Sequence, residues 1–228
     1  MEASQVRNQV EFSKIDEHST LLSDIIDQEN LRRTVPSVNS TFDPARLTEC
    51  PRRLLYRCNG TDHSPLKSYL DLQSDISIKN KWIKIFGSSH KIKVQDKVVV
   101  ADATFNITGS PDIVFVRDYG VYLGQIKPVS NEVFKRIILT GSLKKDVVET
   151  IIYIWLMEIK DGFLLYDNKD NGGYLVVHVL PYKPIIKTVK EICKRLISQK
   201  IDGILPERRY KFCDANECQV CEFKDKCW

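Results

Sequence analysis

One stretch of the chain, GSPDIVFVRDYGVYLGQIK at residues 109–127, predicts two β-strands joined by a tight turn at RDYG. If Arg117 pairs with Gly120, the register places Asp112 directly opposite Gln125. Opposed residues of an antiparallel pair point to the same face, and Lys127, two residues beyond Gln125, shares that face. The hairpin therefore predicts that three polar side chains from two neighbouring strands converge.

These three side chains suit metal chemistry. A carboxylate and an amide oxygen are ligands for a hard divalent cation such as Mg²⁺ or Mn²⁺. An ammonium beside them can orient a water molecule or stabilise charge on a phosphoryl group. The alternative is that GSPD forms only a turn, and that Gln125 and Lys127 lie on a solvated strand face. Geometry alone leaves both interpretations open.

The segments around the hairpin predict helices and strands in one core. Alternation and β-branched residues predict three or four antiparallel strands over 90–129 and another over 173–182. Helical spacing of apolar residues predicts helices over 64–87, 142–162 and 184–200. Asp43 and Pro44 begin a short helix that is interrupted at Pro51. The predicted fold class is α/β, with a central mixed β-sheet flanked by helices.

The cysteines are the next informative residues. The sequence has no run of eighteen apolar residues, and its N-terminal segment is polar, so we expect neither a membrane span nor a signal peptide. We therefore expect a cytoplasmic protein. Thiols stay reduced inside a cell, so clustered cysteines favour metal binding over disulfides. Four of the seven cysteines fall in the last sixteen residues: Cys213, Cys218, Cys221 and Cys227.

Positive charge gathers near the end of the chain. From Lys183 to Lys211 there are nine Lys or Arg residues against three Asp or Glu. This segment is either a solvated helix face or a surface that touches a polyanion such as nucleic acid.

The hairpin resembles the PD-(D/E)XK nuclease superfamily, whose pattern is an Asp at the start of one core strand and an acid, any residue and a Lys on the next. Here SPD ends at Asp112, and QIK runs from Gln125 to Lys127. RecB-like members carry Gln-x-x-x-Tyr on the following helix, where this chain has ETIIY, Glu149 to Tyr153. The resemblance spans about residues 44–228 and implies a restriction-endonuclease-like core.

The tail adds a second resemblance. CQVCEFKDKC has the C-x2-C-x5-C spacing of AddB-type and CRISPR-associated RecB-like nucleases, which add a remote cysteine before a Pro-Arg pair and hold a [4Fe–4S] cluster. The segment ECPRRLLY supplies the remote residue, so the resemblance implies four ligands: Cys50, Cys218, Cys221 and Cys227. It leaves three cysteines spare: Cys58, Cys193 and Cys213. Zinc and unliganded thiols are the alternatives.

The chain departs from the family pattern at three places. Gln125 replaces the acid, and Glu149 replaces the Gln of the helix motif. The early helix, which often brings a metal-binding His, carries Lys79, Asn80 and Lys81. We interpret the first two departures as an exchange, in which Glu149 restores the charge that Gln125 removes. A Gln-x-Lys version also occurs in Mrr-like and McrC-like restriction nucleases.

The resemblance implies a role for each site residue. The metal shell would comprise Asp112, Gln125, the backbone carbonyl of Ile126, and Glu149. Lys127 would hold the attacking water near the phosphate. Tyr153 would contact the DNA backbone, or is instead a core aromatic residue of its helix.

Two functions follow from these residues. The first is a Mg²⁺- or Mn²⁺-dependent nuclease acting on single-stranded DNA or duplex ends in recombination, repair or CRISPR-like processing, with protein partners of such complexes and no membrane. The second is a catalytically weakened nucleic-acid-binding iron–sulfur subunit of a DNA-processing complex. The expected domains are a peripheral helix and linker at 1–43, a nuclease domain at 44–212, and a cysteine cluster at 213–228 that packs with Cys50.

Overall fold

The computed structural model describes residues 41–60, 69–89, 93–95, 98–117 and 120–228. The helix predicted near the N-terminus lies outside these residues. The helical elements are η2 (Pro44–Arg46), α2 (Pro51–Cys58), α3 (Tyr69–Gly87), α4 (Asn131–Thr140), α5 (Lys144–Leu156), α6 (Lys183–Ile201), α7 (Asn216–Gln219) and α8 (Lys224–Cys227). The strands are β1 (Lys93–Gln95), β2 (Val100–Asp102), β3 (Ile107–Gly109), β4 (Ile113–Arg117), β5 (Gly120–Val129), β6 (Gly162–Asn168) and β7 (Tyr174–Val179).

A mixed five-stranded sheet forms the centre of the fold, in the order β1-β4-β5-β6-β7. Strands β5 and β6 pair in parallel and the other neighbours pair antiparallel. Arg117 pairs with Gly120 and Ile113 pairs with Gly124, so the predicted hairpin register is confirmed. Strands β2 and β3 form a separate two-stranded sheet. The prediction of an α/β fold with a central mixed sheet is therefore correct.

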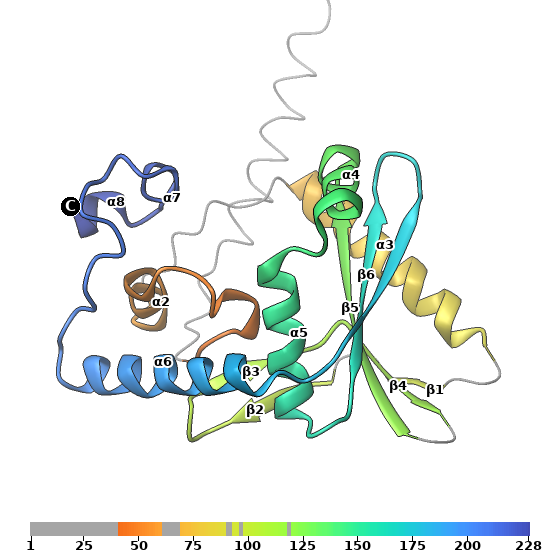
Figure 1. Cartoon of the computed structure of the whole chain (residues 1–228), viewed down its shortest axis with the longest axis horizontal. Helices are drawn as coiled ribbons and strands as arrows, with labels where there is room; N and C mark the ends of the chain where they lie inside the picture. The colour runs from red at the N-terminus through yellow and green to blue at the C-terminus, as the bar shows by residue number, and fades with distance from the viewer. Residues whose placement is uncertain (1–40, 61–68, 90–92, 96–97, 118–119) are drawn as a thin grey trace, which may run out of the picture.

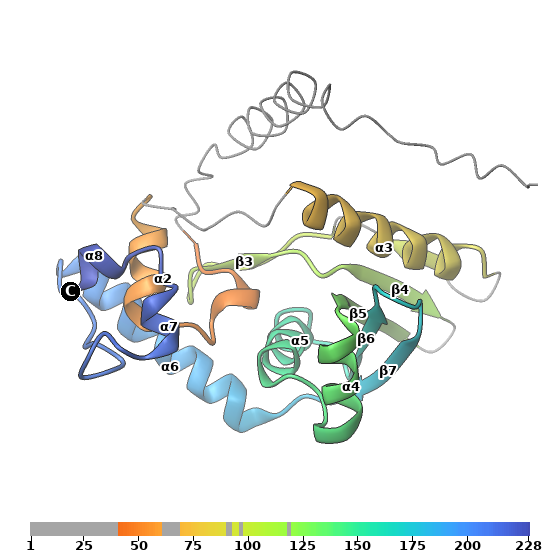
Figure 2. The ribbon, with the colours of Figure 1, turned by 90° about the horizontal axis from the view of Figure 1, so that it is seen from above.

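Helices cover both faces of the five-stranded sheet (Figures 1 and 2). On one face, Trp82 of α3 packs with Ile113, Ile126 and Leu165 from the strands. On the other face, α4 and α5 pack against β5 and β6 through a core that includes Leu123, Phe134, Ile137, Ile154, Leu164 and Tyr166. The alternation of side chains along β5 therefore sends Ile126 towards α3, and Gln125 and Lys127 towards α5.

The parallel pairing of β5 with β6 explains one error in the sequence reading. The helix predicted over 142–162 ends at Leu156, and Gly162 begins β6. A parallel neighbour of β5 must return from the far end of the sheet, and α4 and α5 provide that crossover. Strand β6 is almost wholly buried, so its short apolar run lacks the alternation that marks a half-exposed strand.

A second corner of the molecule is built from α2, α6 and the tail. Asp43 caps η2, as predicted, but this helix already ends at Arg46. Pro51, where an interruption was predicted, instead begins α2. Helix α6 extends from the sheet to this corner, where α2 lies between α6 and the tail that carries α7 and α8 (Figures 1 and 2). Leu54 and Cys58 of α2 share a buried core with Cys193 and Leu196 of α6. In the part of the chain that is described, no helix is long and apolar enough to cross a bilayer.

Candidate active site and cysteine corner

Asp112 stands at the junction between SPD and β4, and both of its carboxylate oxygens are engaged. The main-chain N–H of Ile126 donates to Oδ2 at 2.8 Å, which fixes the carboxylate against β5. The ammonium of Lys79, from α3, donates to Oδ1 at 2.5 Å. The side chain of Asp112 is 12% exposed, so the contact with Lys79 lies mostly out of water.

Gln125, Lys127 and Glu149 complete the cluster from β5 and α5. Lys127 Nζ donates to Glu149 Oε2 at 2.6 Å. The amide orientation that satisfies the neighbours of Gln125 places its nitrogen 3.1 Å from Asp112 Oδ2 and 3.2 Å from Glu149 Oε1. Gln125 is 1% exposed and thus bridges two carboxylates inside the protein. The structure therefore brings together the four side chains that the sequence singled out.

Burial and charge set the protonation of the Lys127–Glu149 pair. Burial lowers the pKa of Lys127, but the hydrogen-bonded carboxylate of Glu149 and the nearby Asp112 more than offset this effect and hold it above its usual value. Burial raises the pKa of Glu149, against the opposing influence of Lys127. Lys127 is consequently an ammonium at neutral pH, suited to stabilise negative charge and not to accept a proton.

Lys79 is a residue of this cluster that the sequence did not assign to the site; it stands on the helix where the resemblance led us to look for a metal-binding His. Its neighbours on the sheet-facing side of α3 are Asp75, Trp82 and Phe86, at helical spacing. Trp82 and Phe86 pack on the sheet. A lysine among the residues of α3 that face the sheet was therefore the signal available in the sequence. The residue that it pairs with is known only once the position of α3 on the sheet is known.

The oxygen donors at this site suit Mg²⁺ or Mn²⁺. Asp112 and Glu149 supply two carboxylates, and Mg²⁺ in proteins is commonly held by one or two carboxylates and several waters. Ligation by the oxygen of Gln125 would require its amide to turn over, because the nitrogen now faces both carboxylates. No group of three His, Cys, Asp or Glu side chains among the described residues is placed to hold a metal ion, so any protein shell here is partial.

Tyr153 lies in the core, one helical turn beyond Glu149. It is 2% exposed, and its hydroxyl donates to the carbonyl of Ser110 at 3.2 Å. Gly109 permits this approach, because a Cβ there would stand 2.6 Å from the Tyr153 hydroxyl oxygen. This placement favours packing over contact with DNA, with Tyr153 holding the segment that leads into Asp112.

Tyr153→Phe is expected to lower the free energy of unfolding by about 1 kcal/mol, the usual net value of one buried hydrogen bond. It should leave DNA affinity unchanged, because the hydroxyl does not reach the surface. Urea denaturation and fluorescence anisotropy with a labelled oligonucleotide measure the two quantities. Weaker DNA binding at unchanged stability would assign the hydroxyl to DNA.

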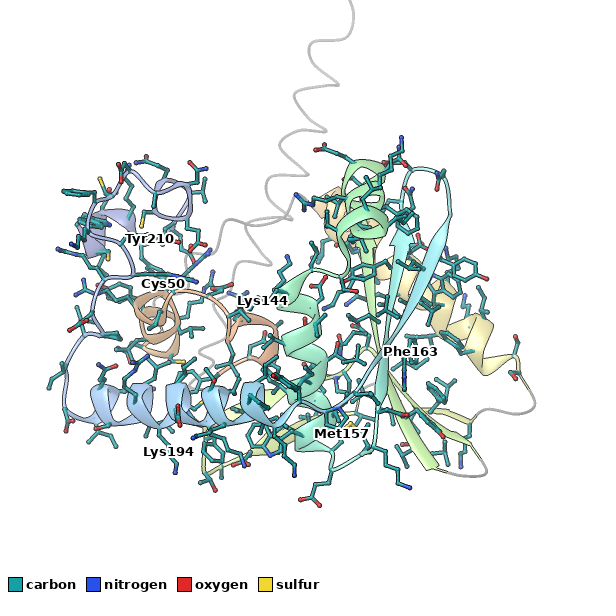
Figure 3. The ribbon with its side chains drawn as sticks, in the orientation of Figure 1. Cys50, Lys144, Met157, Phe163, Lys194 and Tyr210 are labelled. Carbon is teal, nitrogen blue, oxygen red and sulfur yellow. The ribbon has the colours of Figure 1, made fainter. Side chains whose placement is uncertain are left out.

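The four cysteines that the resemblance singled out line one cavity of about 340 Å³. Cys50 stands at the N-terminus of α2, facing the tail (Figure 3), and Cys218, Cys221 and Cys227 come from the tail itself. Cys58 and Cys193 are buried elsewhere, in the core between α2 and α6. The four thiols are free. Among the described residues, these thiols do not form a group of three or more placed to hold one metal ion.

Contacts that do not involve the cysteine sulfur atoms also hold the tail against α2. Glu222 is 4% exposed and accepts hydrogen bonds from Arg53 and Arg57. The rings of Tyr56 and Phe223 lie 5.2 Å apart, and Phe223 is buried. Arg208 donates to the carbonyl of Cys227 at 2.7 Å. Ion pairs and aromatic packing therefore fix the tail against α2.

Known structures share this fold. The alkaline exonuclease LHK-Exo from Laribacter hongkongensis matches with a TM-score of 0.56 at 12% identity, over 72% of this chain and 89% of that chain. Its complex with dAMP matches with a TM-score of 0.58 at 10% identity, over 75% and 93%. SSO0001 matches with a TM-score of 0.58 at 16% identity, over 92% and 97%. Neither a search of protein-family models nor a search of curated proteins gave a match.

Proposed function

We propose that this chain is a divalent-metal-dependent nuclease that hydrolyses phosphodiester bonds in single-stranded DNA or at duplex ends. The observation that carries the proposal is the convergence of Asp112, Gln125, Lys127 and Glu149 at one end of the β4–β5 hairpin. The fold in which they converge is shared with LHK-Exo, an alkaline exonuclease that was also solved with dAMP. We propose that the chain acts inside a cell, in recombination, repair or CRISPR-like processing. We also propose that it acts there with further protein partners.

Each side chain has a role in this proposal. A bound Mg²⁺ or Mn²⁺ would polarise the phosphate and acidify a water molecule. Asp112, Glu149 and the carbonyl of Ile126 would hold the ion, and Gln125 keeps the two carboxylates in position. Lys127, held as an ammonium by Glu149, would orient the attacking water and stabilise charge on the phosphate.

The direct test is cleavage of labelled single-stranded and duplex DNA with Mg²⁺, Mn²⁺ or EDTA. Metal-dependent cutting is the expected result, and labelling either end of the DNA distinguishes exonuclease from endonuclease products. DNA binding without cutting would instead favour the second candidate, a nucleic-acid-binding subunit. The replacement of an acid by Gln125, and the ion pair of Asp112 with Lys79, are the features that favour that candidate.

Helix α6 offers a surface for the DNA backbone outside the site. One face of this helix carries a row of lysines at helical spacing, and they line a shallow surface depression: Lys183, Lys187, Lys190 and Lys194. The ammonium of Lys190 lies over the Trp155 ring at 4.7 Å, and that of Lys194 lies over the Phe105 ring at 5.8 Å. Lys194 projects from the side of α6 that faces away from α2 (Figure 3). We propose that this row binds successive phosphates.

Lys187→Gln with Lys194→Gln is expected to weaken DNA binding and to reduce the slope of log affinity against log salt by about two. Both lysines are exposed, so the free energy of unfolding should fall by no more than about 1 kcal/mol, the value of the contact between Lys194 and the Phe105 ring. Anisotropy titrations at several salt concentrations measure the slope. The control is Lys84→Gln with Lys160→Gln, which removes two exposed lysines outside α6. An equal loss in the control would show only an effect of net charge.

We also propose that the cysteine cavity holds a [4Fe–4S] cluster, which acts as a structural clip between α2 and the tail. The support is that Cys50 meets three cysteines from the other end of the chain around one space. Thiolates are the usual ligands of such clusters. Zinc is the alternative, and metal analysis distinguishes the two, because the cluster requires about four iron atoms per chain.

Alkylation of the native chain is expected to separate ligand cysteines from spare ones. Burial raises the pKa of the Cys193 thiol to about 12 and also raises that of Cys58, so both should resist iodoacetamide. The metal-free chain should take labels on the partly exposed cysteines: Cys50, Cys213, Cys218, Cys221 and Cys227. After anaerobic reconstitution with iron and sulfide, Cys213 alone should remain reactive. Mass spectrometry reads out the labels, and protection of Cys213 would overturn the ligand assignment.

A further inference from the structure

The directly paired charges at the candidate active site cancel before any metal is added, and the buried carboxylate of Asp146 lies close enough to act on both Lys127 and Glu149. Asp112 and Glu149 carry two negative charges, and Lys79 and Lys127 carry two positive charges in direct contact with them. Lys127 belongs to the hairpin and pairs with Glu149. Lys79 belongs to α3 and pairs with Asp112. A divalent cation would bring the same positive charge that the two ammonium groups already provide.

The two ammonium groups are not held equally. Lys127 projects from a central strand, and its side chain is 19% exposed. The side chain of Lys79 is 35% exposed. Its ammonium stands at the end of a flexible side chain and contacts a single oxygen of Asp112. Lys79 can therefore withdraw into water by rotating its own side chain, whereas Lys127 is confined by β5 and α5.

A metal and Lys79 need the same oxygen. The N–H of Ile126 occupies one direction at Oδ2 of Asp112, and the Gln125 amide lies 3.1 Å from that same atom. Oδ1 is thus the oxygen with fewer main-chain and amide contacts, and Lys79 is bound to it. A cation that approached Oδ1 would also meet the repulsion of the ammonium in a poorly hydrated site.

We propose that Lys79 is an internal counter-ion that competes with the divalent metal for Asp112, so that metal binds only by displacing the Lys79 ammonium. This inference rests on the proposed function, because it concerns the loading of the same site. It makes metal affinity weaker than the two carboxylates alone would give. Occupancy of the site then depends on the metal concentration around the protein.

The test is calorimetric titration of the full chain with Mn²⁺ in the absence of DNA. Lys79→Met is expected to bind Mn²⁺ about 10- to 100-fold more tightly than the parent, the range given by the net value of one hydrogen bond to a charged group. Lys79→Gln should behave in the same way, which covers the case in which the Met variant folds poorly. Lys79→Arg keeps the positive charge and should keep weak binding. Lys84→Met, on the same helix, is the control and should match the parent.

Unchanged or weaker Mn²⁺ binding in the folded Met and Gln variants would overturn the inference. If the parent also cleaves DNA, that result removes only the role of Lys79 and leaves the proposed function intact. Absence of Mn²⁺ binding in the parent and all variants would overturn both. Tighter binding in the variants without any DNA cleavage would support the counter-ion and count against the nuclease.

Discussion

Replacing Asp112 with asparagine is expected to reduce metal-dependent DNA cleavage by about 10³-fold or more, while DNA binding persists. The asparagine oxygen can still accept the N–H of Ile126, so the hairpin should keep its shape. The substitution removes the negative charge that would attract the metal, and single electrostatic contacts in active sites contribute about 10²–10³-fold to rate. Loss of the metal adds to that loss. Initial rates on labelled DNA, with affinity measured in EDTA, check both expectations.

Asp170→Asn is the matched control for this substitution. Asp170 also accepts a main-chain N–H, that of Asn131 at 2.6 Å, but it is exposed and lies two residues beyond the end of β6. Cleavage by this variant should equal that of the parent. If Asp112→Asn still cleaves at the parental rate, Asp112 is not a metal ligand and the proposed site is wrong.

Glu222→Ala is expected to lower the free energy of unfolding by about 3–5 kcal/mol, the cost of leaving a buried charge without its partner. Glu222 lies between Arg53 and Arg57, and the Arg57 side chain is 10% exposed. Without the carboxylate, the mostly buried guanidinium of Arg57 would lose one acidic partner and keep its contact with Glu49. Chemical denaturation of the iron-free chain measures this loss in the free energy of unfolding without any contribution from the proposed cluster.

Glu217→Ala provides the contrast on the same tail. Its partner Arg209 stands 3.4 Å away, and the Glu217 side chain is 59% exposed. Exposed pairs contribute about 0–1 kcal/mol, so this variant should stay near the parental stability. Comparable losses in the two variants would mean that burial of the Glu222 network does not set the stability of the tail.

The hairpin was predictable because its constraints are local. The turn at RDYG and the alternation beside it fix one register, and that register sets Asp112 opposite Gln125. The i,i+4 spacing of Glu149 and Tyr153 placed both on one side of a helix, although only the structure separates the site residue from the core residue. The roles of these residues stay predictions.

The remaining features depend on docking between distant elements. Lys79 reaches Asp112 only because α3 lies across β5, and no local pattern specifies that helix orientation. Strand β6 was not predicted, because a short buried apolar run has no alternation that distinguishes a strand from a helical segment. Helix α4 was not predicted either. It is a short helix of 10 residues in the crossover from β5 to β6.

The corner between α2 and the tail has a consequence for synthesis on the ribosome. Arg52 contacts the sulfur of Cys227, and the two residues are 175 positions apart. When α2 leaves the exit tunnel, the surface that will cover Tyr56 does not yet exist. Such long-range closure is slow compared with helix formation. The nascent α2 therefore waits with an aromatic side uncovered until the tail has been synthesised and can pack against it.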